Sequence, residues 1–380
     1  MVLGDDWMNK KLFFTNSTIE DILNSDSLFI YGAGIMGRAL KKCLEEEPYN
    51  KKISSFVVGE MANNPNYIDD VPVVDIDHAS IYKDEMILVA LHEKHIQVAL
   101  ENLTQAGFNK LVPISFDSDI WSDIRGNWFL EQSEGQKLLC TEAYATDDYP
   151  VEDITVYIVK SAFDRELKEI VEDRYYEIPI QVGAALTDVD ISDIKDNIGD
   201  NISMKNRQFC ELTAIYWMWK HNTSKYVGLN HYRRKFVVNE KSVKEMLDEE
   251  VDIILTVPVL NFLGVREQYL KDHDKCDWDA MVEAINILCP EYKDTLDLVG
   301  SGIYYFAYNM FITKKDIFDE YCEWLFPILF YCEEKIGYKE DRYQNRYVGF
   351  LAERLLTVYF LHNKDKYKIG LARKHFIGTV

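Results

Sequence analysis

Short apolar runs of strand length alternate with helical patterns along most of this chain, and this alternation limits the folds that it can adopt. The first run, residues 27–31, leads into the turn Gly32-Ala-Gly-Ile-Met-Gly37 and then into the helical pattern 38–45. Further strand-like runs follow at 53–58, 71–75, 86–91 and 110–114. Strands that alternate with helices form a parallel sheet with crossover helices on its faces. The sequence therefore predicts an α/β fold.

A chain of 380 residues is long enough for two or three domains. We expect a Rossmann-like domain at residues 1–118, followed at 119–152 by a linker with a short helix. A second α/β domain is expected over 153–380, beginning with the apolar run 154–159. Within it the pattern predicts one continuous helix over 204–221 and one strand over 306–313.

The glycine pattern of the first domain, with Gly32, Gly34 and Gly37, follows a strand and opens a helix. In that position the helix amides can hold a phosphate. A dinucleotide site also needs an acid at the end of the second strand, and here Glu60 comes late. Nucleotide or sugar-nucleotide binding and a purely structural turn both stay open for this loop, with hydride chemistry as a third alternative.

The net charge of −22 argues against a nucleic-acid binder, because phosphate neutralisation needs clustered Lys and Arg. Basic residues do gather near the C-terminus, where peripheral contact with anionic lipid is an alternative to a solvated tail. No apolar run is long enough to predict a membrane-spanning helix, and the first residues lack a secretory pattern. Seven scattered cysteines without a Cys-x-x-Cys pair indicate reduced thiols, so we expect a cytoplasmic protein.

Polar side chains are concentrated in two neighbouring segments of the second domain, residues 197–220 and 226–234. They are Asp200, Asn201, Lys205, Asn206 and Glu211 in the first segment, and Asn230, His231, Tyr232, Arg233 and Arg234 in the second. A packed core does not need this density of amides, acids and bases. These segments therefore predict a binding or catalytic site.

The two segments resemble a domain of unknown function that occurs in bacterial capsular and exopolysaccharide glycosyltransferases. Residues 308–312 with 320–329, and residues 349–356, extend the resemblance, which covers roughly residues 153–362. The resemblance implies a GT-A-like domain behind the Rossmann-like one. It also implies transfer of a hexose, with galactofuranose or galactose as examples, from a UDP-sugar to a capsular, exopolysaccharide or lipid-linked saccharide acceptor.

In the common GT-A-like fold, an Asp-x-Asp after a central strand binds a divalent cation that neutralises the donor diphosphate. Here the strand pattern 226–229 is followed by Asn230-His-Tyr-Arg-Arg234 and not by a carboxylate pair. Two guanidiniums offer bidentate donors to phosphate oxygens, so we expect a metal-independent diphosphate clamp. The alternatives are that Arg233 and Arg234 pair with surface acids, or that Mn²⁺ or Mg²⁺ binds elsewhere, for instance at Asp188, Asp190 or Asp193.

Further residues are expected on the donor side. Lys160 ends the first strand of the domain, and Lys205 and Asn206 fall in the first turn of the predicted helix. A lysine at that end opposes the helix dipole, which favours a role in contacting nucleotide or sugar. Glu211 shares an apolar helical face, so its carboxylate needs a polar partner, for which an Arg or the ribose of uridine is a candidate.

Glu353 is the expected general base, because it lies in the otherwise apolar helical segment 349–356 and burial would raise its pKa. Asp188 and Asp190 are the reserve candidates. Alternatively, Glu353 pairs with a neighbouring Arg or orients a substrate hydroxyl. Tyr308 and Asn309 are expected on the acceptor side, where an amide can both donate to and accept from sugar hydroxyls.

Two other classes of function stay open. An NAD-linked sugar-nucleotide epimerase or dehydrogenase would explain the glycine pattern but not the polar segments of the second domain. A non-catalytic scaffold in capsule assembly is the other class, because the loss of a single catalytic residue is enough to turn an enzyme into such a scaffold. Release of UDP from a panel of UDP-sugars would distinguish all three.

Overall fold

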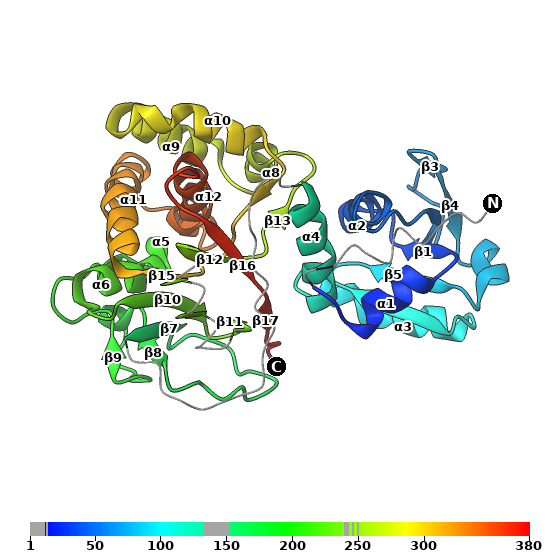
Figure 1. The fold of residues 1–380 in the computed structure, drawn as a ribbon, viewed down its shortest axis with the longest axis horizontal. Coiled ribbons are helices and arrows are strands. Elements are labelled where there is room, and N and C mark those ends of the chain that lie inside the picture. The colour runs from blue at the N-terminus through cyan, green and yellow to red at the C-terminus, as the bar shows by residue number, and fades with distance from the viewer. Residues whose placement is uncertain (1–11, 13, 133–152, 239–242, 245–246, 249–250) are drawn as a thin grey trace. The chain divides into compact units, whose positions relative to one another are not determined.

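The alternation of strands and helices is present in the computed structural model, which describes residues 12, 14–132, 153–238, 243–244, 247–248 and 251–380. The chain divides into two units, Met1–Gln136 and Lys137–Val380, each built around its own sheet (Figure 1). The fold is therefore α/β, with a Rossmann-like unit followed by a GT-A-like unit.

The first unit has a six-stranded sheet in the order β3-β4-β2-β1-β5-β6, and its paired strands are parallel except β3 and β4. Its strands are β1 (Leu28–Tyr31), β2 (Ile53–Val58), β3 (Tyr67–Ile68), β4 (Val71–Asp75), β5 (Met86–Ala90) and β6 (Lys110–Ile114). Its α-helices are α1 (Ser17–Asn24), α2 (Ile35–Glu45), α3 (Glu93–Gln105) and α4 (Asp119–Gln132). Apolar side chains of the central strands, such as Phe29, Val57 and Ile87, pack against Leu103 of α3 in one core.

Helix α4 lies in the stretch expected as a linker, yet it packs as part of the first unit. The buried amide of Asn127 accepts from the Phe14 N–H at 2.9 Å and donates to the Phe14 carbonyl at 2.8 Å. Its Nδ2 also donates to the Tyr49 hydroxyl at 2.8 Å. A buried amide with partners on both sides fixes the helix in one position.

The second unit contains a larger sheet, whose main path runs β16-β12-β15-β10-β7-β8-β9. Its strands are β7 (Ile154–Lys160), β8 (Glu177–Gln181), β9 (Ile194–Lys195), β10 (Tyr226–His231), β11 (Arg234–Phe236), β12 (Ile253–Thr256), β15 (Phe311–Lys314), β16 (Ile369–Ala372) and β17 (Lys374–Phe376). A separate pair is formed by β13 (Val259–Leu260) and β14 (Tyr304–Tyr305). On the main path, β15 runs antiparallel to both of its neighbours, while the other paired strands are parallel.

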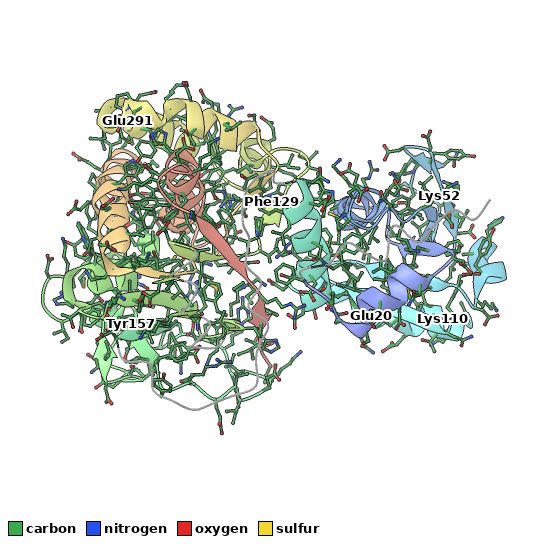
Figure 2. The ribbon with its side chains drawn as sticks, in the orientation of Figure 1. Glu20, Lys52, Lys110, Phe129, Tyr157 and Glu291 are labelled. Atoms are coloured by element: carbon green, nitrogen blue, oxygen red, sulfur yellow. The ribbon has the colours of Figure 1, made fainter. Side chains whose placement is uncertain are left out.

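The described α-helices of this unit are α5 (Asn206–Phe209), α6 (Leu212–His221), α8 (Val265–Asp272), α9 (Lys275–Leu288), α10 (Lys293–Ser301), α11 (Lys315–Ile336) and α12 (Tyr347–His362). Helices α9 to α12 gather on one side of the sheet (Figure 1). Tyr157 of β7, labelled in Figure 2, is buried, and its hydroxyl donates to Asn222 Oδ1 at 3.1 Å. No helix in the described part of the chain is long and apolar enough to cross a membrane.

Two predicted elements are interrupted. The helix expected over 204–221 is divided into α5 and α6, because Cys210 adopts φ 50° between them. The strand expected over 306–313 is shorter in the structure: β14 ends at Tyr305, β15 begins only at Phe311, and the connection between them contains Tyr308 at φ 73° and Asn309 at φ 50°. Non-glycine residues with such angles carry backbone strain, which is frequent at functional sites. Both interruptions lie beside the same group of side chains.

Candidate functional site

The topology of the second sheet points to one end of β7 and β10. These strands are adjacent and parallel, with Val159 of β7 opposite His231 of β10. The chain continues from β7 to β8 on the other side of β7, so the strand order reverses between β7 and β10. In open α/β sheets, ligands bind outside the carboxyl ends of the strands at such a reversal. Lys160 and His231 mark this end of the sheet.

The backbone of Tyr308 connects two predicted site residues at this end. Its N–H donates to Glu353 Oε1 at 2.8 Å, and its carbonyl accepts from His231 Nε2 at 2.7 Å. The left-handed conformation of Tyr308 and Asn309 thus holds both side chains on one short segment. Because the segment contacts β10 and α12 together, a carboxylate and an imidazole are fixed relative to each other.

Glu353 is half-buried on α12 and has a second partner, Arg354 Nη1, at 2.8 Å from Oε2. Burial raises the pKa of the Glu353 carboxyl, and nearby Glu211 adds to the rise, while Arg354 and the Tyr308 N–H oppose it. Arg354 is itself buried between the rings of Tyr305, at 4.1 Å, and Tyr269, at 5.2 Å. A carboxylate can accept about four hydrogen bonds, so both oxygens keep capacity for a substrate hydroxyl.

His231 is held as a neutral ring. A carbonyl oxygen only accepts, so the contact with Tyr308 assigns the proton to Nε2. Burial lowers the pKa of His231 most strongly, and Arg234 and Arg346 also lower it, against the opposing effects of Glu211 and the Tyr308 carbonyl. The ring therefore stays uncharged at neutral pH, with Nδ1 as an acceptor.

Glu211 and Asn309 form a second pair in the same group. Asn309 Nδ2 donates to Glu211 Oε1 at 2.7 Å and to the Gly349 carbonyl at 3.3 Å. Asn309 is buried, and its Oδ1 has no hydrogen-bond partner among the described residues. Arg346 reaches the adjoining residue, with Nε 3.2 Å from Cys210 Sγ. The partner that the sequence demanded for Glu211 is thus an amide from the opposite segment.

Arg233 and Arg234, after β10, and Lys374, in the C-terminal strand β17, supply further positive charge. The Arg234 guanidinium lies 4.6 Å from the Tyr308 ring and 5.0 Å from the Phe376 ring. Arg233 lies 5.4 Å from the same Phe376 ring. Lys374, which is only 3% exposed, places Nζ 5.1 Å from the Tyr308 ring. Part of the basic C-terminus is therefore built into the fold, through the pairing of β17 with β11.

The structure thus brings together the predicted residues Glu211, His231, Arg234, Tyr308, Asn309 and Glu353, which we call the β10-end cluster. Arg346 and Arg354 also belong to it: Arg346 was not predicted, whereas Arg354 is the neighbouring arginine that the alternative for Glu353 expected. Arg354 follows Glu353 directly in an apolar helix, which was a signal for a buried pair.

Other predicted donor residues are held by internal contacts. Asn230 donates to Glu177 Oε1 at 2.7 Å and accepts from the Phe236 N–H at 3.1 Å, so its amide ties β10 to β8 and β11. Lys205 pairs with Glu333 of α11. Asn206 Nδ2 donates to the Cys210 carbonyl at 2.8 Å.

The remaining candidates have separate environments. Lys160 Nζ is 3.5 Å from Asp173 Oδ2, and the Tyr232 N–H donates to the Val159 carbonyl at 3.0 Å. Asp200 accepts from the Tyr216 hydroxyl at 3.1 Å, and Asn201 donates to the Gly199 carbonyl at 2.7 Å. Asp188 and Asp190 are exposed between β8 and the edge strand β9, where Asp190 pairs with Lys195.

The glycine loop of the first unit has two constrained positions and one open position. A Cβ at Gly32 would lie 2.7 Å from the Ala90 carbonyl oxygen, and one at Gly37 would lie 2.0 Å from the Gly32 carbonyl oxygen. At Gly34, an added Cβ would meet no described atom within 4 Å. Gly32 and Gly37 are therefore explained by the packing of the turn, whereas Gly34 leaves open space before α2.

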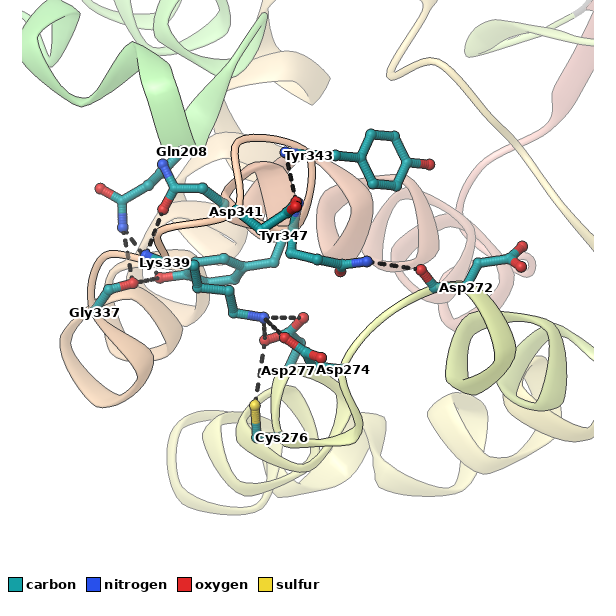
Figure 3. Close-up of polar contacts among 12 residues, drawn as sticks. Gln208, Asp272, Asp274, Cys276, Asp277, Gly337, Lys339, Asp341, Tyr343 and Tyr347 are labelled. Carbon is teal, nitrogen blue, oxygen red and sulfur yellow. Dashed lines mark hydrogen bonds and ion pairs between the residues drawn. The ribbon is translucent and has the colours of Figure 1, made fainter.

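Among the described residues, one group has the geometry to offer three ligands to a metal ion: Asp274, Cys276 and Asp277 at the start of α9. The Lys339 ammonium already contacts this group, 2.8 Å from both Asp274 Oδ2 and Asp277 Oδ2 (Figure 3). The lysine thus provides the positive charge that these acids require.

Comparison with known proteins identifies the family. The model of a domain of unknown function, DUF4422, matches residues 162–364, which is more than half of the chain. The chain belongs to the DUF4422 family. No curated protein matches it in sequence.

Among solved structures, the chain is similar to the apo form of the WbbM bifunctional glycosyltransferase, with a TM-score of 0.52 and 25% identity. The match covers 60% of this chain and 46% of WbbM, so this DUF4422 protein spans less than half of that chain. A shorter match to RSP, a Rex-family repressor, covers 28% of this chain and 60% of that one at 16% identity. Its TM-score of 0.22 is too low to carry an argument.

Proposed function

We propose that this DUF4422 protein is a glycosyltransferase that moves a hexose from a UDP-sugar to a saccharide acceptor. The observation that supports this most directly is the β10-end cluster, in which a half-buried carboxylate, Glu353, lies near Arg234 at the end of the sheet where open α/β folds commonly bind ligands. The similarity to a bifunctional glycosyltransferase supports the same class of reaction.

In the proposed reaction, Glu353 accepts the proton of the acceptor hydroxyl while that oxygen bonds to the anomeric carbon of the donor sugar. The bond from that carbon to the diphosphate breaks, and UDP leaves with the electron pair. The raised pKa of Glu353 suits a general base, since such groups work best near the operating pH. Arg354 holds the carboxylate in place through its 2.8 Å contact.

The departing diphosphate would be neutralised by Arg233 and Arg234, whose guanidiniums stay charged at any relevant pH. Their position after β10 corresponds to that of the Asp-x-Asp which, in the common GT-A-like fold, binds the cation that neutralises the donor diphosphate. We propose that these cations remove the need for a divalent metal; Mn²⁺ or Mg²⁺ bound at exposed acids such as Asp188 and Asp190 is the alternative. Lys160, at the end of β7, would contact the same donor.

The proposed acceptor is a capsular, exopolysaccharide or lipid-linked saccharide, and galactose or galactofuranose is the proposed sugar. The proposed location is the cytoplasm, with peripheral membrane contact through the basic C-terminus. Lys366 pairs with Glu320, and Lys374 is buried, so only part of that basic segment is available to lipid.

The test is UDP release from a panel of UDP-hexoses, in the presence and absence of a saccharide mixture. A transferase should release UDP from one donor at a rate that rises with acceptor. A protein that binds UDP but releases none from any donor would instead fit a scaffold. Oxidation or epimerisation of a sugar nucleotide with NAD would move the function to the first unit, where Gly34 faces open space.

A further inference from the structure

Several side-chain contacts hold the loop that joins α11 to α12, residues 337–346. Lys339 Nζ contacts Asp277 of α9 and Asp274, the N-cap residue of that helix, and Asp277 is fully buried. The Lys339 N–H donates to Asn345 Oδ1 at 2.9 Å, which closes the loop on itself (Figure 3). The ion pair and this hydrogen bond together hold the loop against the start of α9.

The middle of the loop is fixed as well. Asp341 Oδ1 accepts from the N–H of Tyr343 at 2.9 Å and from that of Gln344 at 2.8 Å. The Gln344 side chain donates to the Asp272 carbonyl at 2.9 Å, and that carbonyl belongs to the last residue of α8. The backbone of Tyr343 therefore has little freedom.

This fastened loop presents an aromatic ring to solvent. Tyr343 is 53% exposed and points away from Lys339 (Figure 3). Its ring centroid lies 5.7 Å from His273 and 5.2 Å from Phe350, and these two rings stack on each other at 4.3 Å. The three rings form one aromatic cluster, with Tyr343 as its exposed member.

The aromatic cluster adjoins the β10-end cluster through α12. Phe350 precedes Glu353 by three residues, so both side chains lie on one face of the helix. Arg346 lies one turn earlier, with its guanidinium 5.5 Å from the Phe350 ring. Its Nε donates a hydrogen bond to Sγ of Cys210, the residue before Glu211. The aromatic ring of Phe350 and the carboxylate of Glu353 therefore lie one turn apart on the same helix, α12.

We propose that Tyr343, supported by Phe350 and His273, is the platform on which the ring of the acceptor sugar stacks. A hexose ring has an apolar C–H face and a polar edge, and a ring such as Tyr packs against the first while polar side chains bind the second. The position of Phe350 one turn before Glu353 assigns the platform to the acceptor, whose hydroxyl must reach that carboxylate. The cations after β10 are suited to the donor diphosphate instead.

This proposal rests on the proposed transferase function and can be tested separately from it. Saturation-transfer NMR on the full chain, with methyl β-galactopyranoside, methyl β-glucopyranoside and UDP together, reports sugar and UDP binding in one sample. We expect transfer to the C–H protons of at least one glycoside. The Tyr343→Ala variant should lower it about fivefold or more, since one stacking contact is lost. Tyr343→Phe should keep it, and so should Tyr338→Ala, which removes another exposed tyrosine of the same loop.

Each outcome has a definite meaning. Equal glycoside signals from the parent and from Tyr343→Ala would overturn the proposal that Tyr343 binds the acceptor sugar. A parent protein that binds UDP but neither glycoside would overturn it as well. A second sample with octyl glucoside tests for a lipid: signals confined to its alkyl chain would indicate lipid binding and also overturn the platform. Glycoside signals that depend on Tyr343, in a protein that does not bind UDP, would keep the platform while removing the UDP-sugar transferase proposal.

Discussion

At the scale of single residues, Glu353 carries the sharpest prediction. A general base contributes about 10²–10⁴-fold in rate, whereas a carboxylate that only pairs with Arg354 would affect stability more than turnover. Glu353→Gln keeps the size of the side chain and its bond to the Tyr308 N–H, but it cannot accept a proton. We expect UDP binding to stay near that of the parent and sugar transfer to be at least about a hundredfold slower; the melting temperature should fall, because buried Arg354 loses its counter-charge.

The pH dependence follows from the same group. Burial raises the pKa of Glu353, so the base becomes protonated and inactive as the pH falls through that raised value. The acid limb of the parent's pH–rate profile should therefore lie above the ordinary glutamate range, and Glu353→Gln should lose it. Glu291→Gln, at an exposed glutamate labelled in Figure 2, is the control and should keep both rate and limb. Normal transfer by a well-folded Glu353→Gln protein would reassign the base to Asp188 or Asp190, or indicate a retaining mechanism.

The two arginines after β10 give a second residue-scale prediction. If Arg233 and Arg234 neutralise the diphosphate, EDTA should leave donor turnover nearly unchanged. Each Arg→Ala change should weaken UDP binding about tenfold or more, because a charge-assisted contact is worth roughly 1.5–3 kcal/mol. Calorimetry would measure the UDP affinity of each variant. Arg207→Ala, on the surface of α5, is the control and should bind UDP as the parent does. A loss above about tenfold in EDTA, reversed by Mn²⁺ or Mg²⁺, would contradict the clamp.

Residue types identified part of the β10-end cluster and one local partner, the arginine next to Glu353, but partners from distant segments could not be predicted. Glu353 and Glu211 stood out because acids in apolar helical segments require a polar environment. The segments that supply their partners are distant in sequence: Asn309 for Glu211 and the Tyr308 N–H for Glu353. For Lys205 the position in the sequence suggested contact with a ligand, but in the structure its ammonium pairs with Glu333 of α11.

At the scale of elements, the break between α5 and α6 can be tested at Cys210. Its φ of 50° and ψ of −126° suit glycine better than a residue with a Cβ. Cys210→Gly and Cys210→Ala both lose the contact with Arg346 Nε, so their difference isolates the backbone. We expect the glycine variant to be more stable than the alanine variant by about 1–3 kcal/mol in urea unfolding. Equal midpoints would mean that the surrounding packing, and not the backbone, determines the break.

Regular elements were predictable because apolar periodicity reports them directly. The expected runs 53–58, 71–75 and 110–114 coincide with β2, β4 and β6. The interruptions at Cys210 and at Tyr308–Asn309 could not be predicted. A left-handed backbone conformation is usually signalled by glycine, and no glycine occurs at these positions. These strained positions supply the contacts of the β10-end cluster, so local propensity failed where the candidate site lies.

At the scale of the whole molecule, two separate cores predict two separable parts. The first unit buries Phe29, Val57 and Ile87 around α3, and the second buries Val156, Tyr226 and Ile312 around its own sheet. Each unit has its own strands and helices packed around its own core, and a unit of this kind can fold alone. Every residue of the β10-end cluster and of the aromatic cluster belongs to the second unit.

A fragment from Asp147 to Val380 should therefore fold and bind UDP with an affinity close to that of the full chain. It begins inside the second unit, after α4, so the amide contacts of Asn127 stay with the first unit. Circular dichroism and a cooperative melt would establish folding, and calorimetry would measure UDP affinity. An insoluble fragment would show that the first unit stabilises the second. A folded fragment that does not bind UDP, beside a full chain that does, would mean that the first unit completes the donor site, and Gly34→Val in the full chain would then test the open space before α2.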